Sequence, residues 1–250
     1  MMDTLNLTVS QWVAMAICAA LIGLSKTGLP GAGILAVPLA AMAVPPRESV
    51  GLVLPMLIFA DLFAVTWYRR HAQWRHLLGL LPWTTVGLAV GFVLLGVLDD
   101  QRLAPVIGGI VLTMLLLRLR TMLGRQPDAD APHHPAFAPT MGSVAGATTM
   151  LANAAGPVMT LYLLAMGMPK QQFIGTAAWF FFAVNWIKVP FHAHHNLITA
   201  QSLQTNVLLL PAIAAGAVGG IVLLNRIPQK AFNIVVFVLA AAAAVKLVIG

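Results

Sequence analysis

The chain of 250 residues is 60% hydrophobic and only 8% charged, with a mean hydropathy of +0.89 and a formal net charge of +7. An ordinary soluble domain is about half apolar and about a quarter charged, so this composition excludes a soluble protein and predicts an integral membrane protein. The positive charges stand at the ends of apolar runs, where they report orientation in the bilayer. We therefore expect the lipid bilayer, and no nucleic acid, as the partner of this surface.

Ten apolar runs follow one another along the chain. Outer-membrane strands would instead show segments of about 10 alternating residues, so we interpret the runs as helices. The runs lie at about Ser10–Leu24, Gly31–Val44, Ser49–Trp67, Leu77–Leu98, Leu103–Leu117, Pro139–Leu151, Ala155–Met168, Phe173–Phe191, Leu203–Leu224 and Ala231–Ile249. The predicted fold is an all-α integral membrane protein with about 8 to 10 membrane segments.

The first two runs of each half are short and contain breaks. Runs of about 14 residues reach only about 21 Å, whereas the hydrocarbon core is about 30 Å thick. The first pair contains GLSKTGLPGAGILAVP, from Gly23 to Pro38, and the second contains GATTMLANAAGPVMTLY, from Gly146 to Tyr162. Non-helical backbone at membrane depth must be buried in protein or line a wet cavity, so the breaks predict a polar site. The alternative for the first break is an extramembrane turn with Lys26 in water.

The two halves of the chain resemble each other. A displacement of 124 positions brings together Pro45 and Pro169, Gly51 and Gly175, and Asp61 and Asn185. We predict a first repeat at residues 1–120, a polar linker at 121–138 and a second repeat at 139–250. Each half has an odd number of crossings when its broken pair returns to its starting side, so the repeats are expected to be inverted.

The basic residues fall unequally on the two sides of this topology. One side carries Arg69, Arg70, Arg75, Arg118, Arg120, Arg125, Lys170, Arg226 and Lys230, and the other only Arg47, Arg102 and Lys246. Cytoplasmic loops are enriched in Lys and Arg, so the first side is predicted to be cytoplasmic. Both termini and the His192–Asn196 loop then face outward from the inner membrane.

Polar residues inside or beside the apolar runs are the candidates for a transport path. Backbone N–H groups at the helix ends near Gly31–Gly33 and Ala155–Pro157 favour anions, and Lys26 adds a full positive charge. Ser and Thr also serve as packing contacts between membrane helices, which is the alternative for Thr149. The candidate substrate-binding residues are Lys26, Thr27, Gly31, Gly33, Thr149, Asn153, Gly156, Trp179 and Asn185.

Asp61 is the only acidic residue well inside an apolar run. Intramembrane carboxyl groups commonly relay protons, so Asp61 is the candidate for proton coupling. The equally weighted alternative is an ion pair with Lys26 or Lys188 that holds helices together. The matching Asn185 keeps a similar shape and hydrogen-bonding capacity without the charge.

Metal, cofactor and catalytic motifs are not evident. The tract FHAHHN from Phe191 to Asn196 has no carboxylate or cysteine beside it, so we interpret it as a solvated or interfacial loop. The lone Cys18 lies in an apolar run and is interpreted as a packing residue. We expect no metal, no cofactor and no enzymatic activity.

The two broken stretches carry a family resemblance. GLSKTGLPGAGILAVP with the following RESVGLVLP, and the run from Thr148 to Pro190, are similar to the sulfite exporter TauE/SafE family of anion permeases. The resemblance implies two similar halves and secondary transport of sulfur-containing anions. Many members carry a triple-glycine run where this chain has Gly31, Ala32 and Gly33, which leaves open whether sulfite itself is the substrate.

The function expected from these features is secondary transport of a small anion such as sulfite or an organosulfonate, with export as the expected direction and Asp61 as the candidate for proton coupling. The alternatives are an anion channel and a carrier of a small carboxylate. The identity of the anion, the coupling ion and assembly into a homo-oligomer are left open by the sequence.

Overall fold

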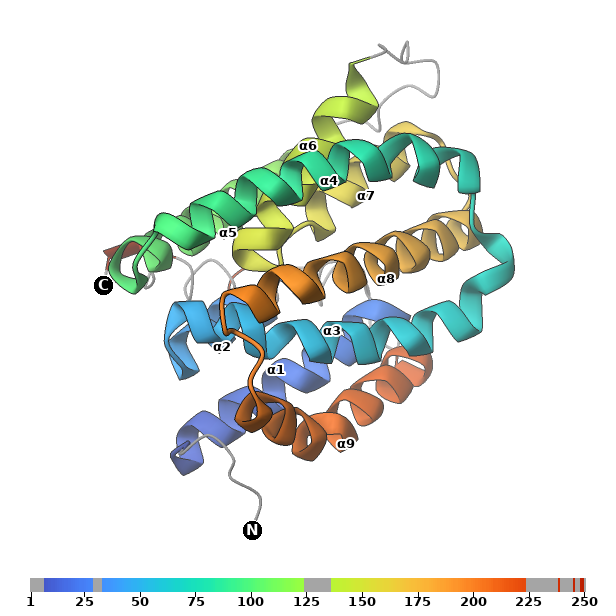
Figure 1. The fold of residues 1–250 in the computed structure, drawn as a ribbon. Helices are drawn as coiled ribbons and strands as arrows, with labels where there is room; N and C mark the ends of the chain where they lie inside the picture. The colour runs from blue at the N-terminus through green and yellow to red at the C-terminus, as the bar shows by residue number, and fades with distance from the viewer. Residues whose placement is uncertain are drawn as a thin grey trace.

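The computed structural model describes residues 7–28, 33–123 and 136–223, together with residues 238, 245, 248 and 249. Within these residues every regular element is a helix, and there is no strand (Figure 1). The elements are α1 (Val9–Thr27), α2 (Gly33–Ala43), α3 (Pro46–Tyr68), η1 (Arg69–His71), α4 (Trp74–Val97), α5 (Asp100–Leu123), α6 (Phe137–Ala152), α7 (Gly156–Ala165), α8 (Lys170–His194) and α9 (Ala200–Leu223). The predicted all-α class is confirmed, and the predicted last run lies almost entirely outside the described residues.

Five of the described helices are long and apolar enough to cross a membrane. They are α1, α3 with η1, α4, α8 and α9. The helices α2 and α7 are short, with 11 and 10 residues, as predicted. The expectation that the first run is also short is wrong. Thr8 caps α1 one residue earlier than expected, and the helix continues through Lys26 to 19 residues, or roughly 28 Å.

The helices α1 and α2, which flank the predicted break, run antiparallel and form the α1–α2 hairpin. The side-chain amide of Gln11 donates to the Ala43 carbonyl at 2.6 Å, and the Cys18 thiol lies 3.4 Å from the Ala36 carbonyl oxygen. Residues early in α1 therefore face residues late in α2. The helix α2 therefore brings the chain back beside α1 to the end of the molecule where α1 begins.

The helices α6 and α7 form a second hairpin. The backbone of α6 stops at Asn153, which adopts a left-handed conformation with φ of 51°. Asparagine tolerates this conformation better than most residues, so it ends the helix without a glycine. Phe137 near the start of α6 stacks on Tyr162 near the end of α7, at 5.7 Å between ring centroids.

The helices α3 and α8 cross the middle of the molecule in opposite directions (Figure 1). Gly51 in the early part of α3 packs against Leu197 just after α8, and Gly175 early in α8 packs against Tyr68 and His71. The α1–α2 hairpin starts at the end where α3 starts, and the α6–α7 hairpin at the end where α8 starts. The two hairpins therefore enter from opposite ends.

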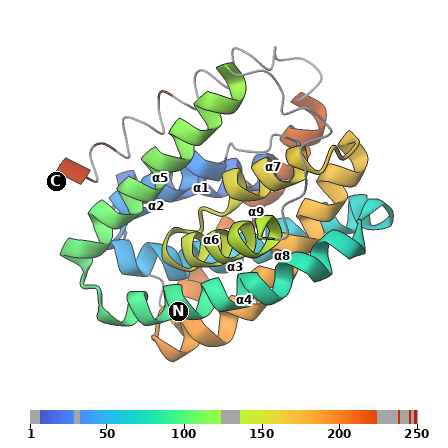
Figure 2. The same ribbon diagram turned by 90° about the horizontal axis from the view of Figure 1, so that it is seen from above.

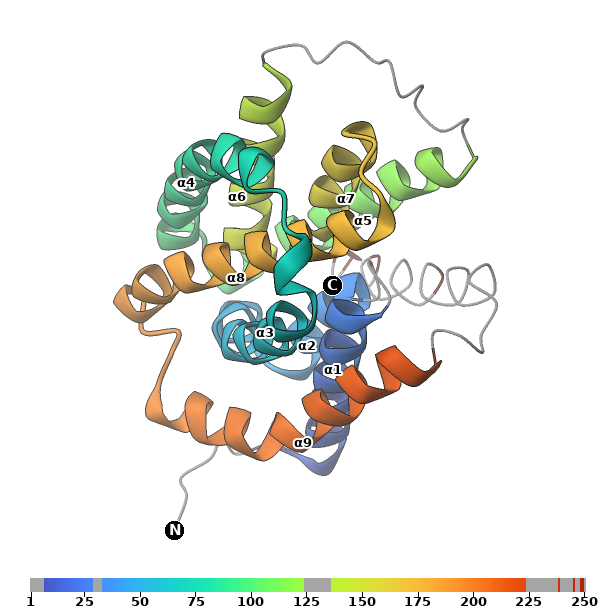
Figure 3. The same cartoon turned by 90° about the vertical axis from the view of Figure 1, so that its right-hand side faces the viewer.

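Two helix pairs flank this centre. The pair α4 and α6 lies on one side and the pair α1 and α9 on the other (Figure 3). In each pair glycine allows backbones to touch, as is common between membrane helices. A Cβ atom added at Gly146 would lie 2.1 Å from the Thr84 carbonyl oxygen, and one added at Gly23 would lie 2.1 Å from that of Ile213.

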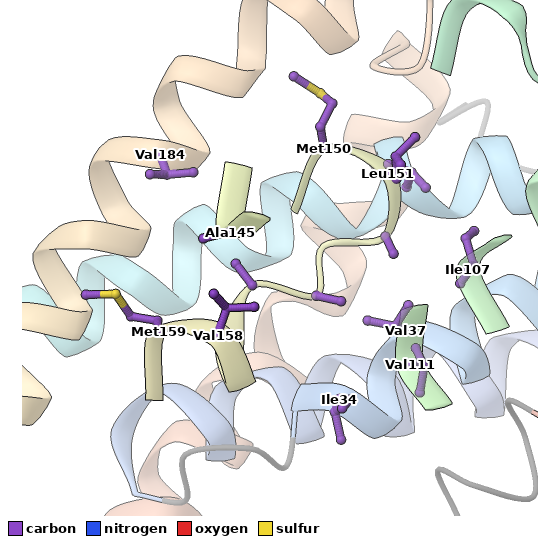
Figure 4. Packing of buried hydrophobic residues seen from close by; sticks show 14 of the residues in the cluster. Ile34, Val37, Ile107, Val111, Ala145, Met150, Leu151, Val158, Met159 and Val184 are labelled. Atoms are coloured by element: carbon purple, nitrogen blue, oxygen red, sulfur yellow. The ribbon is translucent and has the colours of Figure 1, made fainter. Parts of the chain in front are cut away.

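The main apolar core lies between the hairpins and α5. The helix α5 runs close to α2, α6 and α7 (Figure 2). The core residues labelled in Figure 4 come from α2, α5, α6, α7 and α8: Ile34, Val37, Ile107, Val111, Ala145, Met150, Leu151, Val158, Met159 and Val184. Large apolar side chains are also exposed along the outer faces of α1, α4 and α9, which is expected of surfaces that meet lipid.

Four of the described arginines lie at opposite ends of the crossing pair α3 and α8. Arg69, Arg70 and Arg75 lie where α3 ends and α8 begins, whereas Arg47 lies at the other end and donates to the carbonyl oxygens of Leu95 and Leu98. Arg125, Arg226, Lys230 and Lys246 lie outside the described residues.

The prediction of a solvated loop at His192–Asn196 is wrong at its start. Helix α8 continues to His194, and the His192 side chain is completely buried.

Candidate functional site

The two broken segments line one cavity of about 100 Å³. This volume is smaller than the pockets of drug-sized ligands, which are about 300 to 1,000 Å³. The lining residues come from both hairpins and from α3 and α8: Ile22, Ser25, Lys26, Gly33, Ile34, Leu57, Ala64, Thr149, Asn153, Ala154, Gly156, Met159, Thr160, Leu163, Phe173, Ile174, Ala177, Ala178, Phe181 and Asn185. The cavity therefore has the size of a small-ion site at a meeting of helix ends.

The cavity extends toward the arginine-bearing end of the molecule. Its lining residues on α8 all lie between Phe173 and Asn185, in the part of this helix nearer η1. Those on α3 are Leu57, at the middle of the helix, and Ala64, in the half that leads to Arg69. The remainder of α8, including Lys188 and His192, is packed beyond the cavity, and both of these side chains are fully buried.

A buried ion pair borders the cavity. Lys26, in the last turn of α1, places its Nζ atom 2.7 Å from Oδ1 of Asp61 on α3. The Lys26 side chain is 12% exposed and that of Asp61 is not exposed at all. The Lys26 Nζ also lies 3.9 Å from the centroid of the Phe181 ring, a cation–π contact. The alternative in which Lys26 is solvated in an extramembrane turn does not fit this geometry.

Asn185 completes this group from α8. Its Nδ2 atom donates to Oδ2 of Asp61 at 2.7 Å, so the Asp61 carboxylate binds one partner with each oxygen. Asp61 and Asn185 are the residues that the displacement of 124 positions brings together in the sequence. Their direct contact places the centre of the site where α3 and α8 cross.

A second buried lysine holds the other break. Lys188 on α8 donates from Nζ to Oδ1 of Asn153 at 2.5 Å and to Oγ1 of Thr149 at 3.3 Å. Asn153 in turn donates from Nδ2 to the Val50 carbonyl of α3 at 3.1 Å. The side chains on which Lys188 acts line the cavity, and Lys188 lies directly behind them.

The structure brings together six of the predicted substrate-binding residues: Lys26, Gly33, Thr149, Asn153, Gly156 and Asn185. Thr27 is instead directed to α9, where its hydroxyl donates to the Ala217 carbonyl at 2.8 Å. Trp179 is directed away from the cavity, donating from Nε1 to the Arg69 carbonyl and packing on Trp74. Gly31 lies outside the described residues.

Three residues that were not predicted, Ser25, Thr160 and Phe181, also line the cavity. Lys188, predicted from the sequence as a polar candidate and a possible partner of Asp61, supports the cavity from behind. Phe181, Asn185 and Lys188 are spaced by four and three positions, which places them on one face of a helix, so the pattern was available in the sequence. Ser25 and Thr160 carry no comparable signal, because single hydroxyl groups are common in membrane helices.

The described residues contain no group of three or more His, Cys, Asp or Glu side chains that could hold a metal ion. The polar atoms at the cavity are instead ammonium, amide, hydroxyl and carboxylate groups. Groups of these kinds can interact with a small ion through charge and hydrogen bonds.

A comparison with models of protein families matches residues 15–247 to the family described as sulfite exporter TauE/SafE. The matched range covers nearly the whole chain, including both broken segments and all the residues of the cavity. Comparisons with curated proteins and with solved structures found no match.

Proposed function

Because the chain belongs to the sulfite exporter TauE/SafE family, we propose that it is a secondary carrier of a small sulfur-containing anion, such as sulfite or an organosulfonate, and that it acts as an exporter. The observation that carries the proposal is the small cavity where both helix breaks meet beside Lys26. Members of this family are multi-pass membrane proteins that export sulfite and related anions. The substrate of this chain and its direction of transport are part of the proposal.

We infer that the two halves form an inverted repeat around this cavity. The support is threefold: α3 and α8 run in opposite directions, the two hairpins enter from opposite ends, and glycines at matching places make the same backbone contacts. Many carriers place their substrate site between such halves and alternate its access by rocking one against the other.

We place the protein in the inner membrane with its arginine-bearing end in the cytoplasm, in accordance with the bias of basic residues toward that side. The cavity extends toward the same end, so we assign the structure to a state that faces the cytoplasm. An exporter would take up its anion in this state.

Asp61 is the proposed site of proton coupling. Adding a proton to its carboxylate removes the counter-charge of Lys26, which then has its full charge available for an anion. Protonation would therefore raise the positive charge beside the cavity by one. Asp61→Asn imitates the protonated form and should abolish the response of transport to a pH gradient while anion exchange continues.

The test of the proposed function is counterflow of radiolabelled sulfite into proteoliposomes that contain unlabelled sulfite. A carrier accumulates the label transiently against its gradient, whereas a channel only equilibrates it, and a carboxylate carrier responds to a carboxylate in place of sulfite. Absence of counterflow with sulfite and with organosulfonates would contradict the proposal.

Adjacent threonines supply a matched pair of variants for this assay. Thr149 lines the cavity, whereas the hydroxyl of Thr148 donates to the Val144 carbonyl of its own helix at 2.7 Å. Thr149→Val preserves the shape and removes a hydrogen bond that is worth about 1.5 to 3 kcal/mol when the partner is charged, so sulfite affinity should fall about tenfold or more. Thr148→Val should leave affinity unchanged. If the two variants changed sulfite affinity equally, the anion would not bind at Thr149.

A further inference from the structure

We infer that Lys188 supplies the uncompensated positive charge of this site and that the site consequently selects a singly charged anion. This inference rests on the proposed anion transport and specifies which side chain provides the charge and which valence of substrate it fits. It differs from the prediction made from the sequence, in which Lys26 supplies the positive charge of the site.

The positively and negatively charged side chains at the site are unequal in number. Among the described residues, three formally charged side chains meet at the cavity: Lys26, Asp61 and Lys188. Lys26 is neutralised by Asp61 at 2.7 Å, and the Asp61 carboxylate accepts its other close contact from the neutral Asn185. The partners of Lys188 are the side chains of Asn153 and Thr149, which are neutral. The group therefore has one positive charge more than it has negative charges.

Lys188 is completely buried, and a buried charge is rarely retained without an opposite charge or full hydrogen bonding. Its ammonium group has three hydrogens, of which two are directed to Asn153 and Thr149. An anion in the cavity would supply the missing negative charge. A singly charged anion makes the group neutral, and a doubly charged one leaves it with an uncompensated negative charge.

Thr149 connects Lys188, which lies behind the cavity, to an anion inside the cavity. The Thr149 hydroxyl accepts a hydrogen bond from Lys188, and no acceptor for its own proton is found in the described part of the chain. That proton is available to a cavity ligand. The positive charge of Lys188 polarises this hydroxyl toward donation, so lysine and threonine act together on one anion.

The experiment measures binding of two anions by titration calorimetry of the purified protein in detergent. Methanesulfonate carries one negative charge and sulfate carries two, while both present sulfur-bound oxygens of similar geometry. Wild type is expected to bind methanesulfonate more tightly. Lys188→Met should lower methanesulfonate affinity at least tenfold. Arg102→Met removes an exposed cation near the start of α5 and is the matched control, with no change expected.

A change at Asp61 tests the net charge of the group while Lys188 stays in place. Asp61→Asn gives the group two positive charges, so its affinity for sulfate should rise at least tenfold. Lys188→Met combined with Asp61→Asn returns the group to one positive charge, now on Lys26, and should recover methanesulfonate affinity relative to Lys188→Met alone. Should Lys188→Met fail to fold, the order of the two anions in Asp61→Asn decides the matter. With Lys188 charged the group has two positive charges and sulfate should bind more tightly than methanesulfonate, whereas with Lys26 as the single charge methanesulfonate should bind more tightly.

Three results would overturn the inference while anion transport stands: wild type preferring sulfate, folded Lys188→Met binding methanesulfonate as wild type does, or Asp61→Asn gaining no affinity for sulfate. Wild-type protein that binds neither these anions nor sulfite would overturn the proposed function, and this inference with it.

Discussion

At the scale of single residues, the ion pair between Lys26 and Asp61 ties α1 to α3 beside the cavity. Its charges are taken out of water, so each depends on the other, and the second Asp61 oxygen depends on Asn185. Breaking such a pair by removing one partner leaves an uncompensated buried charge. Replacing both partners by neutral groups is far less costly.

Lys26→Met is therefore expected to lower the free energy of unfolding by about 3 to 5 kcal/mol. The double variant Lys26→Met/Asp61→Asn should recover most of this loss, since an asparagine in place of Asp61 can still accept from Asn185 and carries no charge. Thermal unfolding in detergent, followed by circular dichroism, measures both. If the single variant is as stable as wild type, Asp61 is not ionised in the folded protein and the charge inventory of the site must be revised.

Much of the site was accessible from the sequence because ionisable and amide side chains are rare in membrane helices. Lys26, Asp61, Asn153 and Asn185 are conspicuous for that reason, and all four meet in the structure. The pairing of these residues could not be predicted. Both Lys26 and Lys188 were possible partners of Asp61 in the sequence. Only the structure shows that Lys26 pairs with Asp61 and that Lys188 contacts the second break.

At the scale of elements, contacts between glycine and backbone hold the outer helix pairs together. The helix α6 meets α4 where Gly146 faces the Thr84 carbonyl and Gly87 faces that of Ser143. Membrane helices gain little from hydrophobic burial against each other, so this close packing is a main source of their association.

Gly146→Ala should consequently destabilise the protein by about 1 to 3 kcal/mol, because the added Cβ would lie 2.1 Å from backbone that cannot rotate away. Gly109→Ala on α5 is the control. A Cβ atom there meets nothing within 4 Å, and alanine is the better helix former, so stability should be unchanged or higher. Melting temperatures in one detergent give the comparison. A harmless Gly146→Ala would show that α4 and α6 are not in this register.

Apolar runs located most of the described helices to within a few residues, but polar residues at their ends misled the prediction twice. The apolar run ends at Leu24, but Ser25, Lys26 and Thr27 continue α1. They can do so because Lys26 pairs with Asp61 and the Thr27 hydroxyl donates to the Ala217 carbonyl. Counting His192 as part of a loop ignored that helix α8 continues into the histidine tract. Tertiary partners decide such ends, and they are not visible locally.

At the scale of the whole molecule, the cavity lies nearer the arginine-bearing end than the opposite end. Beyond Asn185 the path along α8 is filled by Lys188 and His192, both buried. A carrier must exchange which of these ends is closed. The two hairpins, entering from opposite ends and meeting at the cavity, are the elements we expect to rock.

The most direct test is labelling of a cysteine placed in the cavity. Thr160 on α7 lines the cavity, and a cysteine is close to threonine in size, so Thr160→Cys in a Cys18→Ala background reports on this space alone. Arg70→Cys and His194→Cys in the same background mark the two faces, because both positions are exposed and lie at opposite ends of the crossing pair α3 and α8.

In sealed membrane vesicles of both orientations, a membrane-impermeant thiol reagent should label the Thr160→Cys variant from the same face as the Arg70→Cys variant. Methanesulfonate or sulfite should slow labelling of the cavity cysteine, and adding Thr149→Val should weaken this protection. Labelling of Thr160→Cys at the same rate with and without either anion, from whichever face, would contradict the claim that this cavity is where the protein binds its substrate.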